Sequence, residues 1–308
     1  MKIEAKKIKE WAQQIGFDTC GMAPANPVDE ANARWLDEWL KAGHEAGMSY
    51  MANHRDVRLH PSALVEGART VLSVALNYYP PRHRSSSEPY IAYYAYGKDY
   101  HDVMKKKLRE LWQIIRENLP DNSNAEARVF VDSAPLLERY WAWRCGLGWI
   151  GKNTTLILPR HGSFFFLGEI VMTIEADQYD EPMKSYCGTC ERCLQACPTH
   201  ALECAYHLNA NRCLSYLTIE NREEIPAEIK GQAQGHLFGC DSCQLACPYN
   251  RFSSSTPVQE FHPSDELLHL QREDLYTMTE EEYRRIFKGS AIKRAKFSGL
   301  QRTIRAWK

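Results

Sequence analysis

The first 80 residues alternate between segments with a helical pattern and a segment with a strand pattern. Apolar residues recur at three- and four-residue intervals over residues 3–15 and 31–41, which predicts two amphipathic helices. Residues 70–78 read TVLSVALNY, a largely apolar run typical of a buried strand. The chain therefore opens with an alternating α/β pattern.

The next hundred residues continue this alternation. Residues 80–89 are polar and rich in Arg and Ser, which predicts an exposed loop. Residues 99–119 predict a long amphipathic helix with a basic face at Lys105, Lys106 and Lys107. Strands are predicted at 128–131, 155–158 and 163–174. Together these elements indicate an α+β or α/β fold, in which a mixed sheet covered by helices occupies residues 1–180.

Eight of the eleven cysteines form two related patterns between positions 187 and 247. The first is a complete CxxCxxCxxxCP run, and the second is the same run with its first cysteine displaced upstream. In such runs the close-spaced thiolates bind one [4Fe–4S] cluster, and the last cysteine, redirected by its proline, reaches the neighbouring cluster. The pattern predicts two clusters, the first bound by Cys187, Cys190, Cys193 and Cys247 and the second by Cys213, Cys240, Cys243 and Cys197.

Residues 181–256 are accordingly predicted to form a ferredoxin-like module whose fold depends on its metal. Structural zinc stays an alternative because CxxC pairs also bind zinc, although zinc gives no reason for two Cys-Pro steps. A disulfide framework is not expected, because the chain is long and begins with a charged amphipathic segment, not an apolar signal region. The remaining thiols, Cys20, Cys145 and Cys204, are expected to be small core residues.

The net charge of the chain limits which kinds of partner are expected. The net charge is −1 at pH 7, so no overall field indicates a nucleic acid, and a polyanion would have to be recognised by a local patch. No apolar stretch approaches the length of a membrane span. These features indicate a soluble, cytoplasmic protein without a membrane partner, and we expect a monomer.

Residues 257–308 differ in character from the rest of the chain. From position 288 onward there is no acidic residue, and the apolar residues Ile292, Phe297, Leu300 and Ile304 recur at helical intervals. This pattern predicts a basic amphipathic helix or helix pair whose cations are Lys288, Lys293, Arg294, Lys296, Arg302, Arg305 and Lys308. A basic face is often only a solvated face, so nucleic-acid contact is one of two interpretations.

Candidate chemistry outside the cysteines is concentrated between residues 132 and 169. Asp132 ends a predicted strand in the sequence VDSAPLLER, and its short side chain could cap a following helix whose first turn carries Pro135. The sequence GLGWIGKN at 146–153 would let the backbone approach a ligand, but it lacks Walker spacing, so simple turns are equally consistent with it. Two clusters alone would indicate an electron carrier, whereas this large N-terminal region indicates a further cofactor or substrate.

Long motifs in the chain resemble one enzyme family. VDSAPLLERYWAWRCGLGWIGKN, HGSFFFLGE, CGTCERCLQACPTHA, NRCLSYLTIE, GCDSCQLACPYN and KGSAIKRAKFSGLQR resemble the epoxyqueuosine reductases, the cobalamin-dependent enzymes that complete queuosine in tRNA. The resemblance runs from about residue 8 to the end of the chain. The catalytic core of the corrinoid reductive dehalogenases is a more distant likeness. The family pattern often continues past the basic helix, so part of an RNA-binding surface is expected to be missing or short.

The resemblance implies a reductive mechanism. A cobalamin in the N-terminal domain would receive electrons through the two clusters, and both carbon–oxygen bonds of an epoxide would be lost to leave an alkene and water. Asp132 matches the proton donor of the family, a role that requires a raised pKa near neutral pH, whereas helix capping would lower that pKa. The implied cofactor contacts are Asn53, Tyr96, Asp132, Lys152, Asn153, Thr154, Gly162, Ser163, Phe164, Ser215 and Asp241. Asn53 departs from the family, which carries arginine there, and no histidine is expected as lower cobalt ligand.

The resemblance also implies the partners. The substrate would be a tRNA that carries epoxyqueuosine in its anticodon loop, where single-stranded bases can be splayed out. The first candidates for phosphate contacts are Arg294, Lys296 and Arg302. An external electron donor such as a flavodoxin or ferredoxin system would be needed. Two other function classes stay open: an electron carrier that binds no corrin, and a corrinoid reductive dehalogenase.

Overall fold

A four-stranded antiparallel sheet forms the centre of the N-terminal half of the computed structural model, which describes residues 2–120, 124–233 and 235–307. The strand order is β2–β3–β8–β5, with bounds Thr19–Pro24, Thr70–Asn77, Phe165–Met172 and Ala127–Phe130. All three pairings in this sheet are antiparallel. The parallel pairings expected of a mixed sheet occur in two short pairs outside it, β1 with β9 (Lys2–Ile3, Glu175–Ala176) and β4 with β12 (Tyr90–Ile91, His236–Phe238).

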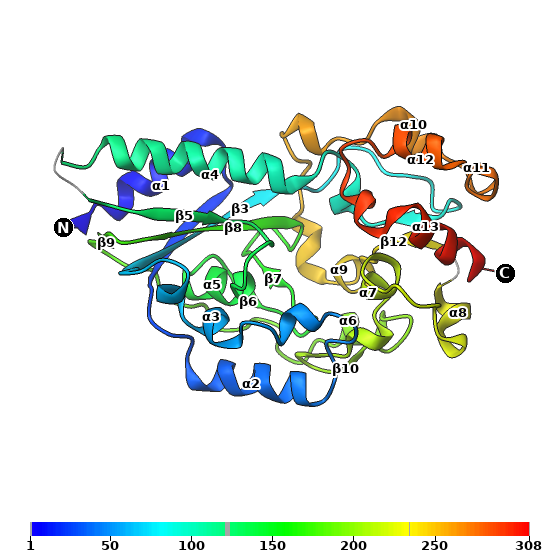
Figure 1. Cartoon of the computed structure of the whole chain (residues 1–308), viewed down its shortest axis with the longest axis horizontal. Helices are drawn as coiled ribbons and strands as arrows, with labels where there is room; N and C mark the ends of the chain where they lie inside the picture. Colours follow the sequence, from blue (N-terminus) through cyan, green and yellow to red (C-terminus); the bar gives the residue numbers. More distant parts are fainter. Residues whose placement is uncertain (1, 121–123, 234, 308) are drawn as a thin grey trace.

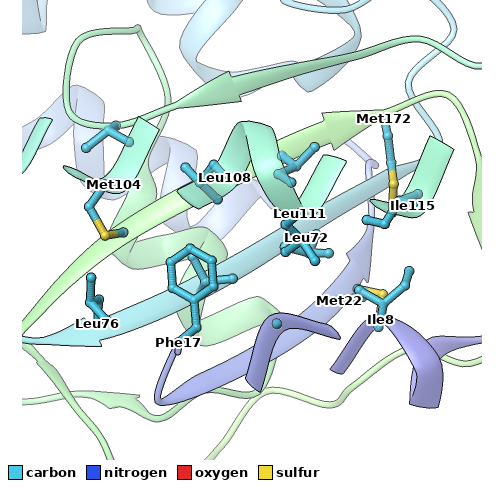
Figure 2. Packing of buried hydrophobic residues seen from close by; sticks show 14 of the residues in the cluster. Ile8, Phe17, Met22, Leu72, Leu76, Met104, Leu108, Leu111, Ile115 and Met172 are labelled. Carbon is cyan, nitrogen blue, oxygen red and sulfur yellow. The ribbon is translucent and has the colours of Figure 1, made fainter. Parts of the chain in front are cut away.

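Helices cover both faces of the four-stranded sheet (Figure 1). On one face, α1 (Ala5–Ile15) packs against β2 and α4 (Tyr100–Glu117) packs against β8, and the two helices contact each other. Figure 2 shows this packing, which involves Ile8, Met104, Leu108, Leu111, Leu72 and Leu76. The other face is covered by α2 (Glu30–Lys41), α3 (Arg55–Leu59) and α5 (Glu138–Arg144). Because alternate residues of β3 enter the two cores, the strand is buried throughout, as its sequence predicted.

The helix and strand predictions for the N-terminal half are confirmed in existence and type. The predicted helices at 3–15, 31–41 and 99–119 correspond to α1, α2 and α4. Of the predicted strands, 128–131 and 163–174 correspond to β5 and β8, and 155–158 to β7 (Leu156–Ile157), which pairs with β6 (Trp149–Ile150). Residues 80–89 form a loop, but Arg84 within it is buried and donates to the carbonyls of Leu267 and Leu270.

The helix predicted to follow Asp132 directly begins later than expected. Helix α5 starts at Glu138, Pro135 precedes it, and no side chain caps its first turn. Asp132 instead has a φ of 53°, in the left-handed region that non-glycine residues seldom occupy. The capping interpretation of Asp132 is therefore wrong, because the backbone turns away before the helix begins.

The C-terminal half consists of short helices and hairpins. The cluster segment contains α6 (Arg192–Gln195), α7 (Leu214–Ile219), α8 (Ala227–Ala233) and α9 (Ser242–Leu245), with a hairpin of β10 (Leu202–Cys204) and β11 (His207–Leu208). It is followed by α10 (Asp265–His269), α11 (Arg272–Thr277), α12 (Glu280–Ile286) and α13 (Lys296–Arg305). Short 3₁₀ turns lie in both halves of the described chain, at Ser49–Met51, Pro61–Ala63, Tyr93–Ala95, Ala210–Arg212, Pro248–Phe252, Gln259–Phe261 and Ala291–Ala295.

One apolar core ties the C-terminal helices to the rest of the molecule. Leu300 and Ile304 of α13 belong to the same buried cluster as Ile91 of β4 and Phe238 of β12. The helix or helix pair predicted in the basic tail is present as the 3₁₀ turn Ala291–Ala295 followed by the single α-helix α13. The division into 1–180, 181–256 and 257–308 stays a prediction. Among the helices that the structure describes, none has the length and apolar character needed to cross a membrane.

Candidate active site and cluster sites

The eight clustered cysteines line two separate cavities, four in each. The outer cavity, of about 270 Å³, is lined by Cys187, Cys190, Cys193 and Cys247. The inner cavity, of about 220 Å³, is lined by Cys197, Cys213, Cys240 and Cys243. The structure thus brings together the same two sets of cysteines that the spacing predicted. In both the prediction and the structure, the last cysteine of each run joins the three cysteines of the other run. Four thiols around one cavity are the donor set of a [4Fe–4S] cluster.

Short helices that begin within the CxxC pairs position these thiols. Helix α6 carries Cys193 and helix α9 carries Cys243, and the two helices contact each other. The backbone N–H of Ala201 donates to Sγ of Cys197 at 3.2 Å. Among the described residues, no three Cys, His, Asp or Glu side chains are grouped as around a single metal ion. In a [4Fe–4S] cluster the thiolates stand around the cluster, one on each iron.

The three remaining cysteines differ in their environment. Cys145 is buried, and its thiol donates to the carbonyl of Val71 at 3.3 Å. Cys20 is half-buried, and burial raises the pKa of its thiol to about 12. Cys204 is exposed on β10, so the expectation that it is a core residue is wrong.

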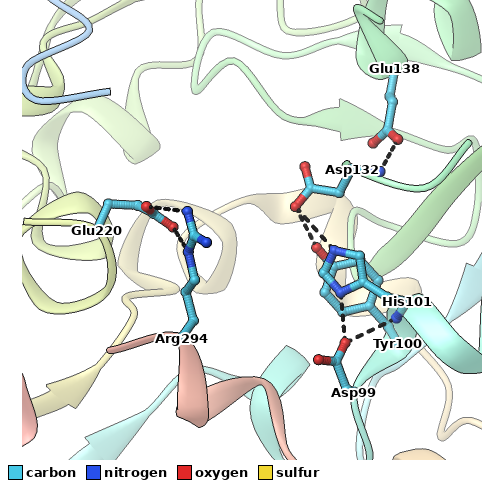
Figure 3. Close-up of polar contacts among 7 residues, drawn as sticks. All are labelled: Asp99, Tyr100, His101, Asp132, Glu138, Glu220 and Arg294. Carbon is cyan, nitrogen blue, oxygen red and sulfur yellow. Dashed lines mark hydrogen bonds and ion pairs between the residues drawn. The ribbon is translucent and has the colours of Figure 1, made fainter. Parts of the chain in front are cut away.

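Asp132 lies in a network of polar side chains just beyond the end of β5 (Figure 3). Its Oδ2 accepts a hydrogen bond from the hydroxyl of Tyr100 at 2.7 Å and lies 3.7 Å from Nε2 of His101. Nδ1 of His101 lies 2.6 Å from Oδ1 of Asp99. Asp99 also caps α4, because its carboxylate accepts from the backbone N–H of His101. The first turn of α4 therefore holds Tyr100 and His101 against Asp132.

A second carboxyl group supports Asp132 from the other side. The backbone N–H of Asp132 donates to Oε1 of Glu138, at the start of α5. The Asp132 side chain itself is 61% exposed, so it is accessible to a substrate. On the sheet below, Glu169 of β8 is buried and accepts from the hydroxyl of Ser73 at 3.1 Å.

The protons of this network sit on the neighbours of Asp132. Desolvation raises the pKa of Asp132, but the hydrogen bonds with His101 and Tyr100 together lower it by a larger amount. The pKa of Asp132 therefore lies below its usual value. The contacts with Asp132 and Asp99 raise the pKa of His101 to about 9. Desolvation and the nearby Asp132 raise the pKa of Glu138 to about 8. At neutral pH Asp132 is therefore ionised, while His101 and Glu138 are protonated. The sequence left the protonation state of Asp132 open, and in this arrangement its pKa is shifted opposite to the direction that a proton donor by itself would require.

The inner cavity joins the cluster segment to the N-terminal domain. Arg139 of α5, which donates to the carbonyl of Thr154 at 2.7 Å, lies on its wall together with Tyr78 and Tyr94. Four residues expected to contact a cofactor line the same cavity: Asn153, Thr154, Ser215 and Asp241. Lys152 borders the outer cavity, as does Asn153. The structure thus places these five residues beside the cysteine sets.

The other residues expected to contact the cofactor have protein partners. Phe164 and Tyr96 are buried, with ring contacts to Tyr93. The backbone N–H of Ser163 donates to Oδ1 of Asn250 at 2.7 Å, and a Cβ at Gly162 would lie only 2.2 Å from the same oxygen. Asn53 lies in an exposed turn. A cofactor contact of Asn53, Tyr96, Gly162, Ser163 or Phe164 stays a prediction.

The basic tail offers fewer free cations than its sequence suggested. Nε and Nη2 of Arg294 each donate to a carboxylate oxygen of Glu220 at 2.8 Å (Figure 3). Lys296 is exposed at the start of α13. Arg302 is buried and donates to the carbonyl of Leu217 at 3.1 Å, so its assignment as a phosphate contact is wrong. Lys308 lies outside the described residues.

The comparisons with known proteins first give the class of the protein. A family model described as a 4Fe-4S double cluster binding domain matches residues 186–250, the segment that contains both cysteine sets. The chain is thus an iron–sulfur protein in which a helix-covered sheet precedes the cluster segment. A second model, described as epoxyqueuosine reductase QueG, DUF1730, matches residues 58–133 and ends one residue after Asp132.

Similar proteins extend the likeness over nearly the whole chain. The epoxyqueuosine reductase of Leadbetterella byssophila is 44% identical over 304 residues, which cover 99% of this chain and 98% of that protein. A crystal structure of an epoxyqueuosine reductase with a tRNA-Tyr epoxyqueuosine-modified stem loop aligns with a TM-score of 0.87 and 28% identity, covering 98% and 79% of the two chains. The Bacillus subtilis enzyme, with its catalytic aspartate loop swung out of the active site, aligns with a TM-score of 0.86, 28% identity and the same coverage.

The chain belongs to the epoxyqueuosine reductase family. A catabolic reductive dehalogenase aligns over 97% of this chain but only 37% of its own, with 16% identity and a TM-score of 0.45, a likeness too distant to carry an argument.

Proposed function

We propose that the protein reduces epoxyqueuosine in a tRNA anticodon loop to queuosine. In this reaction both carbon–oxygen bonds of the epoxide break, two electrons and two protons are consumed, and an alkene and water form. The observation that carries the proposal is the inner cavity, whose wall joins four cysteines to Arg139 and Thr154 of the N-terminal domain, next to the network around Asp132. Electron transfer and proton transfer would meet at this place.

The residues present fit the cofactors of such a reaction. Each cysteine-lined cavity offers the four thiolates of one [4Fe–4S] cluster. We propose that a cobalamin binds between the inner cysteines and Asp132, where aromatic faces at Tyr78 and Tyr94 and polar groups at Arg139 and Ser215 suit a large flat ring with an amide-bearing rim. When bound, the clusters supply single electrons and the cobalamin supplies a reduced cobalt for the bond chemistry.

The network around Asp132 holds as many protons as the reaction consumes. At neutral pH one proton is stored on His101 and one on Glu138, on either side of the ionised Asp132. We propose that His101 passes its proton from Nε2 to Oδ2 of Asp132, and that Asp132, which is accessible, delivers it to the departing epoxide oxygen. Tyr100 orients the carboxylate through its hydrogen bond. Asp132 is then the catalytic residue, and His101 and Glu138 are positioning residues that reload it.

The tRNA would bind near the C-terminal helices. Lys293 and Lys296 are exposed, and among the described residues neither takes part in an ion pair. We propose that these two lysines contact phosphates directly, and that Arg294 does so after leaving Glu220. An external flavodoxin or ferredoxin, a monomeric state and a cytoplasmic location complete the proposal.

Mass spectrometry of the nucleosides tests this function. The protein would be reconstituted anaerobically with iron, sulfide and cobalamin and incubated with a reductant and tRNA that carries epoxyqueuosine. Queuosine is the expected product, and omission of cobalamin should abolish its formation. Reconstituted protein that binds both clusters but no corrin would instead indicate an electron carrier. Turnover of a halogenated phenol without any action on the tRNA would indicate a dehalogenase.

A further inference from the structure

The outer cavity is the cluster site on the surface side of the electron path. The inner cavity is lined by Arg139, whose charge helps to lower the pKa of Asp132, whereas none of the described residues that line the outer cavity is among the main causes of that shift. All eight cluster cysteines are half-buried, so the lining residues, and not the burial of the thiols, distinguish the two cavities. If electrons enter from outside the protein, the outer cavity is the shorter way in.

Exposed apolar side chains gather in the same segment. Six large hydrophobic side chains are exposed among the described residues, and three of them, Tyr186, Leu245 and Phe252, lie in the cluster segment. Tyr186 is 51% exposed next to Cys187, and its carbonyl accepts from the hydroxyl of Tyr249 at 3.2 Å. Leu245 lies on α9, which packs against α6. Tyr186 also lines the outer cavity, so an exposed apolar side chain borders the outer set of cysteines, where a partner could meet it.

This apolar surface has a basic rim. The ammonium group of Lys184 lies 6.0 Å from the ring centre of Tyr186, and the guanidinium of Arg251 lies 4.6 Å from that of Phe252. Arg192 is exposed on α6. Among the described residues, none of these three cations takes part in an ion pair. Segments 182–200 and 242–259 contain a single acidic residue, Glu191, although the whole chain has a net charge of −1.

We propose that this surface, formed by Tyr186, Leu245 and Phe252 with Lys184, Arg192 and Arg251, docks an acidic one-electron carrier protein beside the cluster site of Cys187, Cys190, Cys193 and Cys247. The inference rests on the proposed function, which requires an external electron source. In each encounter the carrier loses one electron and the cluster gains one, and no proton or bond is involved. Two encounters supply the two electrons of one turnover.

The position of the surface favours a redox protein over the tRNA. A basic rim attracts phosphates as well as carboxylates. The substrate, however, must reach Asp132, whereas Tyr186 and Arg251 of this surface line the cavity of the outer thiols. Apolar contacts at the centre with complementary charges at the rim give fast association and an orientation that brings the two redox centres close.

Stopped-flow reduction of the reconstituted holoenzyme, without tRNA, tests the inference. Bleaching of the cluster absorbance would be followed with two reductants: reduced flavodoxin, as the acidic carrier, and reduced methyl viologen, which needs no docking surface. The double variant Lys184→Glu with Arg192→Glu should be reduced by flavodoxin about tenfold or more slowly. Its reduction by the viologen should be unchanged. Calorimetric titration with oxidised flavodoxin should show a correspondingly weaker Kd.

A matched control carries the same change of charge elsewhere. Lys6 and Arg34, with side chains 82% and 71% exposed on α1 and α2, would be changed to Glu, and flavodoxin should reduce this variant at the wild-type rate. Equal flavodoxin rates in both double variants would overturn the proposal. So would tRNA binding that is weakened only by the changes at Lys184 and Arg192, because the surface would then belong to the RNA.

Two measurements keep the test independent of folding and of the proposed function. The wild-type rate with flavodoxin should fall steeply as salt rises from about 50 to about 500 mM, and a salt-independent rate would count against the surface without any variant. Lys184→Gln alone should give a smaller loss in the same direction. Bleaching of the cluster absorbance needs no substrate. A failure to form queuosine from tRNA would therefore refute the proposed function without affecting the interpretation of the reduction rates.

Discussion

Nε2 of His101 lies 3.7 Å from Oδ2 of Asp132, and in this pair the proton rests on the imidazole, not on the carboxylate. A carboxylate with a lowered pKa is a poor acid by itself. It becomes an effective proton donor when a neighbouring cation reloads it at the moment when negative charge develops on the substrate oxygen. The functional unit is therefore the pair, held in place by Asp99 and by the first turn of α4.

Replacement of His101 by Asn should lower kcat by about 100-fold, because Asp132 loses the group that returns its proton. The loss should depend on pH. The wild-type rate should be highest where His101 is protonated and should fall as the pH rises through about 9. The variant should lack this decline near pH 9. Queuosine formation measured against pH by nucleoside mass spectrometry checks both expectations.

An exposed histidine provides the control for this change. His269 lies on α10, and its Nδ1 bonds to the carbonyl of Asp265 at 2.7 Å. His269→Asn should leave both the rate and its pH dependence unchanged. A His101→Asn enzyme with the wild-type profile would show that His101 only supports the helix.

The two cysteine sets should respond to substitution independently. Cys190→Ser in the outer set and Cys240→Ser in the inner set should each lower the iron content from about eight to about four atoms per chain, because each removes one ligand from one cluster. Cys204→Ser, at an exposed cysteine outside both cavities, should leave the iron content unchanged. Iron analysis of anaerobically purified protein measures this. Loss of all iron in both variants would mean that the sets do not form separate sites.

The exchange of last cysteines can be tested in the same way. Cys247 lines the outer cavity although it follows Cys243 in sequence, and Cys197 lines the inner cavity although it follows Cys193. Electron paramagnetic resonance should therefore show that Cys247→Ser alters the same cluster as Cys190→Ser. An altered signal shared with Cys240→Ser would contradict this assignment.

The tail residues should separate into those that contact RNA and those that maintain the fold. Lys293→Glu with Lys296→Glu should weaken tRNA binding about tenfold and reduce its salt dependence, because exposed lysines release counterions when they meet phosphates. Arg302→Ala should lower the melting temperature instead, because a buried guanidinium and its bond to the carbonyl of Leu217 are lost. Filter binding at several salt concentrations and thermal unfolding distinguish the two effects. An Arg302→Ala protein with normal stability and weak, salt-insensitive tRNA binding would reverse the assignment.

The sequence predicted those features whose pattern is local. The period of apolar residues located α1, α2, α4 and β3, and the spacing of cysteines located both sets, because each signal lies within a short stretch of chain. The antiparallel order of the four-stranded sheet could not be predicted in this way, since β2 and β3 are separated by 45 residues and their pairing is decided by packing. The burial of Arg302 could not be predicted for the same reason. Its charge predicts a surface position, but α13 packs against α7 and the guanidinium donates to a carbonyl of that helix.

The network around Asp132 was only half visible in the sequence. The sequence points to Asp132, but it presents Tyr100 and His101 only as the start of a helix. The adjacent Asp99, a typical N-cap residue, is the one signal that this turn is held rigidly. Glu138 was missed because Asp132 was expected to cap the helix that Glu138 begins. Its distance of six residues along the chain is closed by the left-handed turn at Asp132, a conformation that sequence alone does not disclose for an aspartate.

Glu138 should contribute to turnover by supplying a proton, and not only by accepting the hydrogen bond from the backbone of Asp132. In Glu138→Gln the amide oxygen can still accept from the backbone N–H of Asp132, so the fold and the melting temperature should stay near wild type. The amide cannot release a proton, so kcat should fall about tenfold. The decline of the wild-type rate as the pH rises through about 8 should disappear, while the decline near 9 that belongs to His101 should remain. Glu281→Gln, at an exposed position on α12, serves as the control. If Glu138→Gln kept the full rate and both declines, the second proton would have to come from solvent.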